Sequence, residues 1–207
     1  MKGPQPLAPI LIIRHGQTDS NKSRVLQTPD TPLSELGLVQ AERLAQHLAH
    51  REIGKIICSD HLRTQQTADA IVKLKSTKLT LSPLLRERNF GDLRGKAYDA
   101  IGDDFFHPEY APPNGETHPE FMQRIQLAWE LVLQSQQQTS GSLVVMTHGL
   151  VIRQLINQHL VVPEETLLLS DYQNTCVTEV DARDKKTVLL WCDAGHLEKN
   201  SDLGAMV

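Results

Sequence analysis

Two short aliphatic runs in this chain each end in the dipeptide His-Gly. They are Ile10 to Ile13, which leads into Arg14, His15 and Gly16, and Leu143 to Thr147, which leads into His148 and Gly149. Aliphatic and β-branched runs of this length predict buried strands. Ligands bind at the carboxyl ends of strands in α/β sheets, where the diverging loops expose backbone amides. If the two strands are neighbours, their imidazoles face each other across one pocket.

Arg14 and His15 stand side by side at the first of these strand ends. The guanidinium fork matches the oxygens of a phosphate group, and Gly16 lets the backbone approach a ligand closely. So short a motif also occurs by chance, and the alternative is a strand that simply ends in polar residues. The second His-Gly pair favours the functional interpretation.

The length and composition are those of an ordinary globular protein. The 207 residues fit one α/β domain, and 40% of them are hydrophobic and 22% charged. The net charge of −4 argues against a nucleic-acid-binding surface, so a phosphate site must be a local positive pocket. No apolar run reaches the roughly 18 residues of a membrane span. Residues 1–9 lack the apolar segment of a signal peptide, and we expect 1–9 and 202–207 to be loose.

The cysteines and histidines give little support to a disulfide or a metal site. Cys58, Cys176 and Cys192 are odd in number and lack CxxC spacing, so free thiols in a reducing cytoplasm are expected. His47 and His50 lie on one predicted helix, but no carboxylate-rich cluster accompanies them. We therefore expect a cytoplasmic protein that needs no metal and no other cofactor.

The first strand end resembles a known signature. Arg14-His15-Gly16-Gln17-Thr18, followed by Asn21, is similar to the RHG motif of the histidine phosphatase superfamily, the phosphoglycerate-mutase-like enzymes. His148-Gly149 is similar to the second histidine of that family. The similarity covers about residues 10–160 and, more weakly, the C-terminal strands. It implies a three-layer α/β/α sandwich with a mostly parallel central sheet, in one domain over residues 1–207.

Two further stretches resemble motifs of the same family. Gln27 and Thr28 open a loop similar to Q-G-x-x-D-x-P-L, in which Thr28 replaces the usual glycine. Arg63 ends the run Ser59-Asp60-His61-Leu62-Arg63, where the family usually has S-D-L-K-R. His61 and Leu62 thus depart from the pattern, while the arginine keeps its place. Taken alone, Arg63 would be an ordinary solvated side chain; the resemblance implies that it binds phosphate and that Asn21, Gln27, Thr28 and Gly149 line the substrate site.

Two glutamates are candidates for the proton donor. Glu87 lies in the pattern L-x-E-x-x-x-G, similar to the setting of the family's proton-donating glutamate, although a surface ion pair would also explain it. Glu116 precedes Thr117 in a sequence that resembles the family's G-E-S. Thr117 and Glu120 also form a capping box, so Glu116 is equally explained as charge at a helix N-terminus. We expect Glu87 to be the acid and Glu116 to bind substrate.

These residues predict phosphoryl transfer to a histidine. Neutral His15 attacks phosphorus with one ring nitrogen while an acceptor holds the proton of the other. Arg14, Arg63 and a protonated His148 neutralise the phosphoryl oxygens, so no metal is required. Glu87 protonates the leaving group and then activates water.

The acceptor decides between two reactions. Water gives a phosphatase, whereas a second hydroxyl of the substrate gives a phosphoglycerate-mutase-type transfer. Only 28 residues separate Glu87 from Glu116, and residues 98–116 are irregular, contain three prolines and predict a lid. The stretch between the two glutamates contains the acidic residues Asp99, Asp103, Asp104 and Glu109, and its basic residues are Arg88, Arg94 and Lys96. This balance disfavours a bisphosphate.

We therefore expect a phosphatase for a small phosphorylated metabolite, with a mutase as the alternative. A non-catalytic phosphate-binding relative is a third class, but neither a nucleophile nor an acid is missing here. We expect a monomer or homodimer with no nucleic-acid or membrane partner.

Overall fold

The computed structural model describes residues 8–163 and 172–197, and a six-stranded sheet lies at its centre. The strands are β1 (Ile10–Arg14), β2 (Ile53–Cys58), β3 (Leu79–Leu81), β4 (Ser142–Thr147), β5 (Val177–Val180) and β6 (Val188–Asp193). Their order is β3-β2-β4-β1-β5-β6. The first four run parallel, while β5 pairs antiparallel with β1 and β6 antiparallel with β5. The prediction of a mostly parallel sheet is confirmed.

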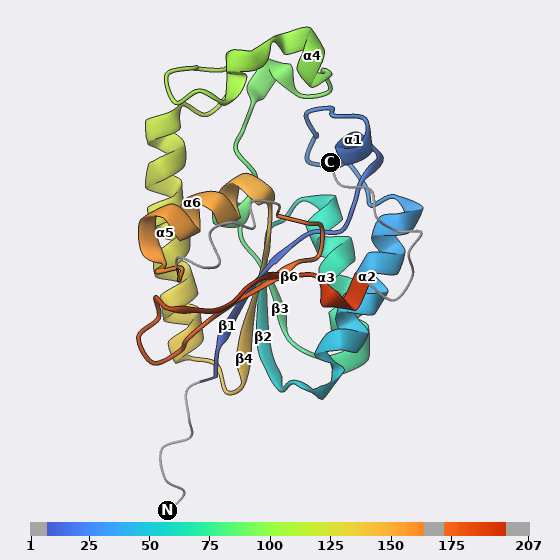
Figure 1. Ribbon diagram of the computed structural model, residues 1–207, viewed down its shortest axis with the longest axis vertical. Helices are drawn as coiled ribbons and strands as arrows, with labels where there is room; N and C mark the ends of the chain where they lie inside the picture. Colours follow the sequence, from blue (N-terminus) through green and yellow to red (C-terminus); the bar gives the residue numbers. More distant parts are fainter. Residues whose placement is uncertain (1–7, 164–171, 198–207) are drawn as a thin grey trace, which may run out of the picture.

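Helices cover both faces of the sheet, as the three-layer prediction requires (Figure 1). One face carries α2 (Glu35–His47) and α3 (Leu62–Lys75), and the other carries α5 (His118–Gln137) and α6 (Gly149–His159). The short helices α1 (Asp19–Lys22) and α4 (Tyr98–Ile101) lie beyond the carboxyl ends of the parallel strands (Figure 1). The 3₁₀ helices are η1 (Leu48–His50), η2 (Pro83–Leu85), η3 (Gly91–Leu93), η4 (Asp103–Phe106) and η6 (Gly195–Leu197).

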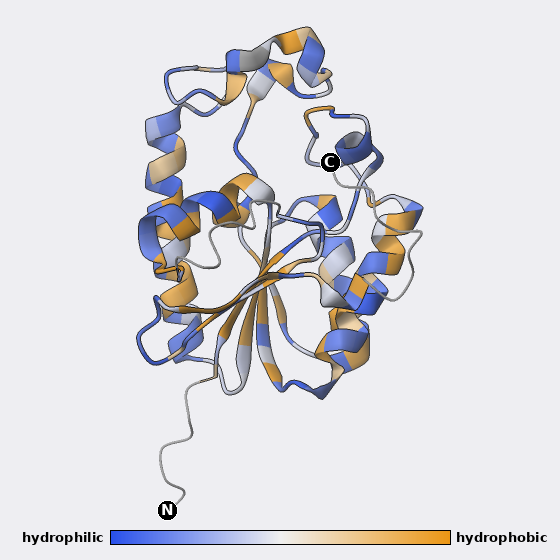
Figure 2. Cartoon of the chain, viewed as in Figure 1, coloured by the Kyte–Doolittle hydropathy of each residue, from blue (hydrophilic) through white to orange (hydrophobic). Residues whose placement is uncertain are grey.

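The central strands are apolar on both faces because helices cover both. In β1, Ile10 and Ile12 pack into the cluster under α5 and α6, while Leu11 and Ile13 pack into the cluster under α2 and α3. A strand buried on both sides is a continuous apolar run rather than an alternating one. Figure 2 shows the difference between the layers: the central strands are largely hydrophobic, whereas the helices on either side carry both hydrophobic and hydrophilic residues. This packing holds the carboxyl ends of β1 and β4 rigidly side by side.

The start of α2 contacts the loop after β1. Ser34 caps the helix by accepting a hydrogen bond from the Gly37 N–H at 3.1 Å. Gln40 accepts one from the Gln17 N–H at 2.8 Å, and a Cβ on Gly37 would lie 2.0 Å from the Gln17 carbonyl oxygen. The helix periodicity predicts that Leu38 is part of the buried stripe, but this prediction is wrong, since Leu38 is 47% exposed. Gly37 and Gln40 occupy the inward positions because this turn packs against a polar loop.

Residues 98–116 are less irregular than predicted, because they contain α4 and η4. Phe105 packs in a small apolar cluster with Leu26, Phe90 and Leu93. This cluster joins the segment to the loop after α1 and to the loop that follows Glu87. A lid function for the segment stays a prediction.

The chain ends lie mostly outside the described residues. Two residues of the N-terminal segment that was expected to be loose have hydrogen bonds. The Ala8 carbonyl accepts one from Gln136 Nε2 at 3.3 Å, and the Pro9 carbonyl accepts one from the Leu143 N–H at 3.2 Å. Residues 1–7 and 202–207 are not described, and the assignment of 1–207 to one domain stays a prediction. Across the described ranges, no helix has both the length and the apolar character that crossing a membrane requires.

Candidate active site

The two His-Gly strand ends meet at one edge of the sheet. Strands β1 and β4 are parallel neighbours, with Arg14 paired to Thr147. His15 and His148 follow directly, and their ring centroids lie 5.1 Å apart at an interplanar angle of 60°. Both imidazoles are buried, His15 being 2% and His148 0% exposed. The expected juxtaposition of the two histidines is confirmed.

The ring of His15 is fixed in one tautomer. Its Nδ1 lies 2.7 Å from the Gly16 carbonyl oxygen, which can only accept, so Nδ1 carries the proton. The lone pair is then on Nε2, for which the described residues provide no hydrogen-bond partner. Burial, followed by the charges of Arg63 and Arg14, lowers the pKa of His15 well below its usual value. A neutral imidazole with a free Nε2 lone pair is the form that a nucleophile requires.

His148 is held through its other nitrogen. Its Nε2 lies 2.8 Å from Ser59 Oγ, and Ser59 Oγ accepts a hydrogen bond from the His61 N–H at 3.3 Å. The Ser59 hydroxyl can therefore donate to Nε2, which leaves a proton on Nδ1. That Nδ1 is buried and without a partner among the described residues.

Without a ligand, His148 favours its neutral form, and its protonation beside a bound phosphoryl group stays a prediction. Burial, then the charges of Arg63 and His15, lowers its pKa well below the usual value. An imidazolium here would lose its hydration beside cations. A neutral ring still offers its Nδ1–H to an anion.

Both arginines that were predicted to bind phosphate lie at the site, and each has an N–H donor without a partner among the described residues. Arg14 donates through Nη1 to the Tyr172 carbonyl, and Arg63, only 1% exposed, donates through Nη1 to the Thr28 carbonyl at 3.0 Å. In each side chain, Nε is buried and lacks a partner among the described residues. A Cβ on Gly149 would lie 3.7 Å from Arg14 Nε, so Gly149 borders the same guanidinium. Buried unpaired donors are costly, and a bound phosphate would satisfy both.

Glu87 contacts the first turn of α6, the helix that begins directly after His148. Its Oε1 accepts from the Arg88 N–H at 3.0 Å and its Oε2 from the Leu150 N–H at 3.2 Å. Burial raises the pKa of Glu87, although the two amides and then Arg63 and Arg14 oppose that effect. The carboxyl group therefore retains its proton to higher pH than an exposed glutamate, which suits a general acid.

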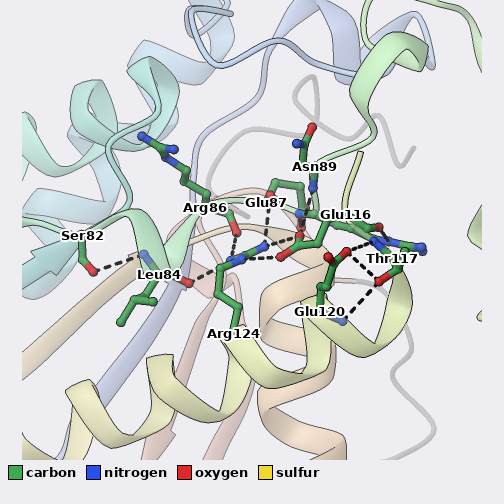
Figure 3. Close-up of polar contacts among 10 residues, drawn as sticks. Ser82, Leu84, Arg86, Glu87, Asn89, Glu116, Thr117, Glu120 and Arg124 are labelled. Atoms are coloured by element: carbon green, nitrogen blue, oxygen red, sulfur yellow. Dashed lines mark hydrogen bonds and ion pairs between the residues drawn. The ribbon is translucent and has the colours of Figure 1, made fainter. Parts of the chain in front are cut away.

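Glu116 is occupied by an ion pair rather than free for substrate (Figure 3). Its Oε1 lies 2.7 Å from Arg124 Nε and its Oε2 2.8 Å from Arg124 Nη2. The Asn89 N–H donates to the same Oε2 at 3.2 Å. Both carboxylate oxygens thus have partners, and a substrate-binding role for Glu116 stays a prediction.

Arg124, which the sequence did not indicate, holds the loop that carries Glu87 (Figure 3). Its Nη1 donates to the carbonyls of Leu84 and Arg86 at 2.9 and 2.8 Å. Its Nη2 lies 3.4 Å from the Glu87 carbonyl oxygen. The Glu116–Arg124 pair therefore fixes the backbone on which Glu87 is mounted.

The three remaining predicted residues shape the loop after β1. Asn21 Oδ1 accepts from the Thr18 N–H at 3.2 Å and so caps α1, while Gln27 Oε1 accepts from Thr18 Oγ1 at 3.1 Å. Thr28 contributes its carbonyl to Arg63. These contacts account for loop structure, and substrate binding by the three residues stays a prediction.

A cavity of about 500 Å³ opens beside these groups. Its walls include His61, Glu87, Arg94 and Glu116. The His61 ring lies 5.0 Å from that of His148, centroid to centroid, so the cavity adjoins the histidine pair. Among residues 8–163 and 172–197, no three His, Cys, Asp or Glu side chains are grouped to hold a metal ion.

The sequence matches the family model described as "Histidine phosphatase superfamily (branch 1)" over residues 10–194. A Schizosaccharomyces pombe protein named "Probable phosphatase C1687.21" is 32% identical over 203 residues, which cover 91% of this chain and 95% of that protein. A Yersinia pestis protein named "Probable phosphoglycerate mutase GpmB" is 29% identical and is matched over 84% of this chain and 85% of its own length.

A solved structure extends the likeness to the fold. The native mycobacterial glucosyl-3-phosphoglycerate phosphatase Rv2419c aligns with a TM-score of 0.73 at 26% identity, over 90% of this chain and 99% of that chain.

Proposed function

The chain belongs to the histidine phosphatase superfamily, and we propose that it hydrolyses phosphomonoesters of small metabolites through a phosphohistidine at His15. The observation that carries this proposal is the hydrogen bond from His15 Nδ1 to the Gly16 carbonyl at 2.7 Å. It leaves the lone pair on Nε2, in a ring that burial keeps neutral. The unpaired donors of Arg14, Arg63 and His148 support a phosphoryl group as the ligand.

In the first step, His15 Nε2 attacks phosphorus as the bond from phosphorus to the ester oxygen breaks. The Nε–H groups of Arg14 and Arg63 and the Nδ1–H of His148 stabilise the charge on the phosphoryl oxygens. Glu87 gives its proton to the departing oxygen, which leaves as an alcohol. The products of this step are the alcohol, phosphohistidine and a Glu87 carboxylate.

In the second step, the Glu87 carboxylate takes a proton from a water molecule that attacks the phosphohistidine. The bond from phosphorus to Nε2 breaks, and inorganic phosphate leaves. His15 returns to its neutral form and Glu87 to its protonated form, so one carboxyl group serves as acid and then as base.

A mutase-type transfer is the alternative, since both a phosphatase and a mutase name occur among the relatives. In that reaction a second hydroxyl of the substrate replaces water. The acidic residues between Glu87 and Glu116 disfavour it, because a bisphosphate needs surplus positive charge to be retained.

Phosphate release from a panel of phosphomonoesters, with a phosphoglycerate isomerisation assay in parallel, tests the proposal. We expect release of phosphate to outpace isomerisation, and acid-labile label from a ³²P-substrate to be trapped on the wild type but not on His15→Ala. Hydrolysis by His15→Ala at the wild-type rate would refute the phosphohistidine. Faster isomerisation than release would replace the phosphatase with the mutase.

We also propose a cytoplasmic location, because Cys58 and Cys176 are buried free thiols, which suit a reducing compartment. We further propose a monomer or homodimer that takes small phosphorylated molecules and no nucleic acid. Size-exclusion chromatography with light scattering tests the oligomeric state.

A further inference from the structure

His61 offers an unsatisfied donor to the cavity. It is 3% exposed, and its Nδ1 lies 3.3 Å from Arg63 Nη2. A guanidinium can only donate, so Nδ1 accepts and the proton of the neutral ring is on Nε2. Burial and then the charge of Arg63 lower the pKa of His61 to about 3, which keeps the ring neutral near pH 7. Nε2 is buried without a partner among the described residues, and His61 lines the cavity.

Arg94 lines the same cavity and is partly buried. Arg94 and His61 line this cavity together, and the positive charge of Arg94 lowers the pKa of both His61 and Arg63. Within the described ranges its side chain has no hydrogen bond or ion pair. The acidic groups on the cavity wall have other hydrogen-bond partners: Glu116 pairs with Arg124, and Glu87 accepts from two main-chain amides. Glu120 accepts from Thr117 and is exposed to solvent, which screens its charge.

Arg86, another cation on the wall, differs from Arg94. It donates to both carboxylate oxygens of Asp60 and is thereby neutralised. Among the described residues, Arg94 therefore offers a guanidinium without a hydrogen-bond partner, and His61 offers an open Nε2–H, in the cavity that adjoins the phosphoryl site. An anion satisfies both groups, whereas a neutral hydroxyl would leave the charge of Arg94 without a counter-charge.

We propose that His61 and Arg94 bind a carboxylate of the substrate in the cavity beside the phosphoryl site. A second phosphate, which the acidic residues between Glu87 and Glu116 disfavour, is the other outcome of the test. The inference rests on the proposed phosphatase activity and narrows its substrates to small phosphomonoesters that carry another anion. His61 stands where the family pattern usually has leucine, so this recognition is a property of this chain rather than of the shared motif.

Matched substrates test the proposal. ω-Carboxyalkyl phosphates and ω-hydroxyalkyl phosphates of equal length, from two to six carbons, differ only in the second charge, and alkanediol bisphosphates supply the phosphate alternative. We expect wild-type kcat/KM to favour one anionic series about 10- to 100-fold at some chain length, the range of a charge-assisted hydrogen bond. The favoured series tells carboxylate from phosphate.

The variants assign the preference to residues. Arg94→Gln should lower the anionic-to-neutral ratio of kcat/KM at least tenfold. Lys96→Gln removes the same charge from an exposed position two residues away and should leave the ratio within about twofold, because charge screened by solvent contributes little. His61→Leu, which restores the usual residue, should lower the ratio, and His61→Gln, which keeps an N–H donor, should retain more of it.

The outcomes separate the two proposals. A wild type that hydrolyses no member of either series refutes the phosphatase proposal. Hydrolysis of both series with equal kcat/KM, or a ratio that Arg94→Gln or His61→Leu leaves unchanged, refutes the second anion site and leaves the phosphatase standing.

Discussion

The main-chain N–H of Leu150 donates to Oε2 of Glu87 at 3.2 Å. Leu150 is the second residue of α6, which begins at Gly149 directly after His148. The proposed acid is therefore tied to the helix whose first turn follows the second histidine. A displacement of this helix start would therefore move Glu87 together with His148, whose Nδ1–H is a proposed hydrogen-bond donor to the phosphoryl group.

Glu87→Gln should impair poor leaving groups selectively. The amide keeps the shape of the side chain but has no transferable proton. An aryl phosphate leaves as a stable phenolate and needs little help, whereas an alkyl phosphate leaves as a basic alkoxide. We expect kcat/KM to fall by about 10²–10⁴ for alkyl substrates and much less for aryl substrates. Equal losses for the two classes would remove Glu87 from the role of acid.

Glu116→Gln and Arg124→Met should disturb the loop that carries Glu87 without removing the proton that Glu87 transfers. Each breaks a bidentate pair whose side chains are 13% and 17% exposed, and each should lower the free energy of unfolding by about 1–3 kcal/mol. The loss of kcat/KM should be similar for alkyl and aryl phosphates, because Glu87 is displaced without losing its proton. If Glu116→Gln instead shows the leaving-group dependence, the two glutamates have exchanged roles.

Some residues of the site could be predicted from the sequence and others could not. His15 and His148 follow from two strands whose apolar patterns place their ends at one sheet edge. Arg63 follows from the resemblance of its stretch to the family motif. Arg124 does not, because its acceptors are main-chain carbonyls 38 to 40 residues away, which have no side-chain signature. The lowered pKa of His148 in the ligand-free protein depends on burial beside Arg63, which the sequence pattern does not show.

Activity should survive removal of divalent metal ions. Arg14 and Arg63, whose buried Nε–H groups lack partners among the described residues, already provide positive charge for the phosphoryl oxygens. We expect turnover in excess EDTA to equal that of the untreated enzyme, and vanadate to inhibit by mimicking five-coordinate phosphorus. Loss of turnover in EDTA that magnesium or zinc restores would show that the arginines do not suffice.

His15→Ala and His148→Ala should differ in the phosphatase activity that remains. His15 supplies the attacking atom, so its loss should abolish turnover of an aryl phosphate. His148 supplies one of several donors to the phosphoryl group, and removing a donor of this kind costs about 10²–10³ in kcat. Steady-state turnover of an aryl phosphate measures both variants. A more active His15→Ala than His148→Ala would exchange the assigned roles.

Acid should destabilise the fold through its buried histidines, and His61 offers a direct measurement. The folded-state pKa of His61 is about 3, below the usual 6.5, so between these values the unfolded chain binds more protons than the folded one. The stability that depends on neutral His61 is thus complete above pH 6.5 and is lost as pH falls toward 3. His15 and His148 act in the same direction, whereas Glu87, whose pKa is raised, favours the folded state at lower pH.

Urea titrations of the wild type and His61→Leu from pH 7 to pH 4 test this linkage. Leucine removes one titrating group and should make the decline of unfolding free energy shallower by at most about 1.4 kcal/mol per pH unit, the limit for one proton. Between pH 7 and pH 4, the unfolding free energy should therefore fall less for the variant than for the wild type. Parallel curves across this range would mean that His61 takes up a proton in the folded protein as readily as in the unfolded chain.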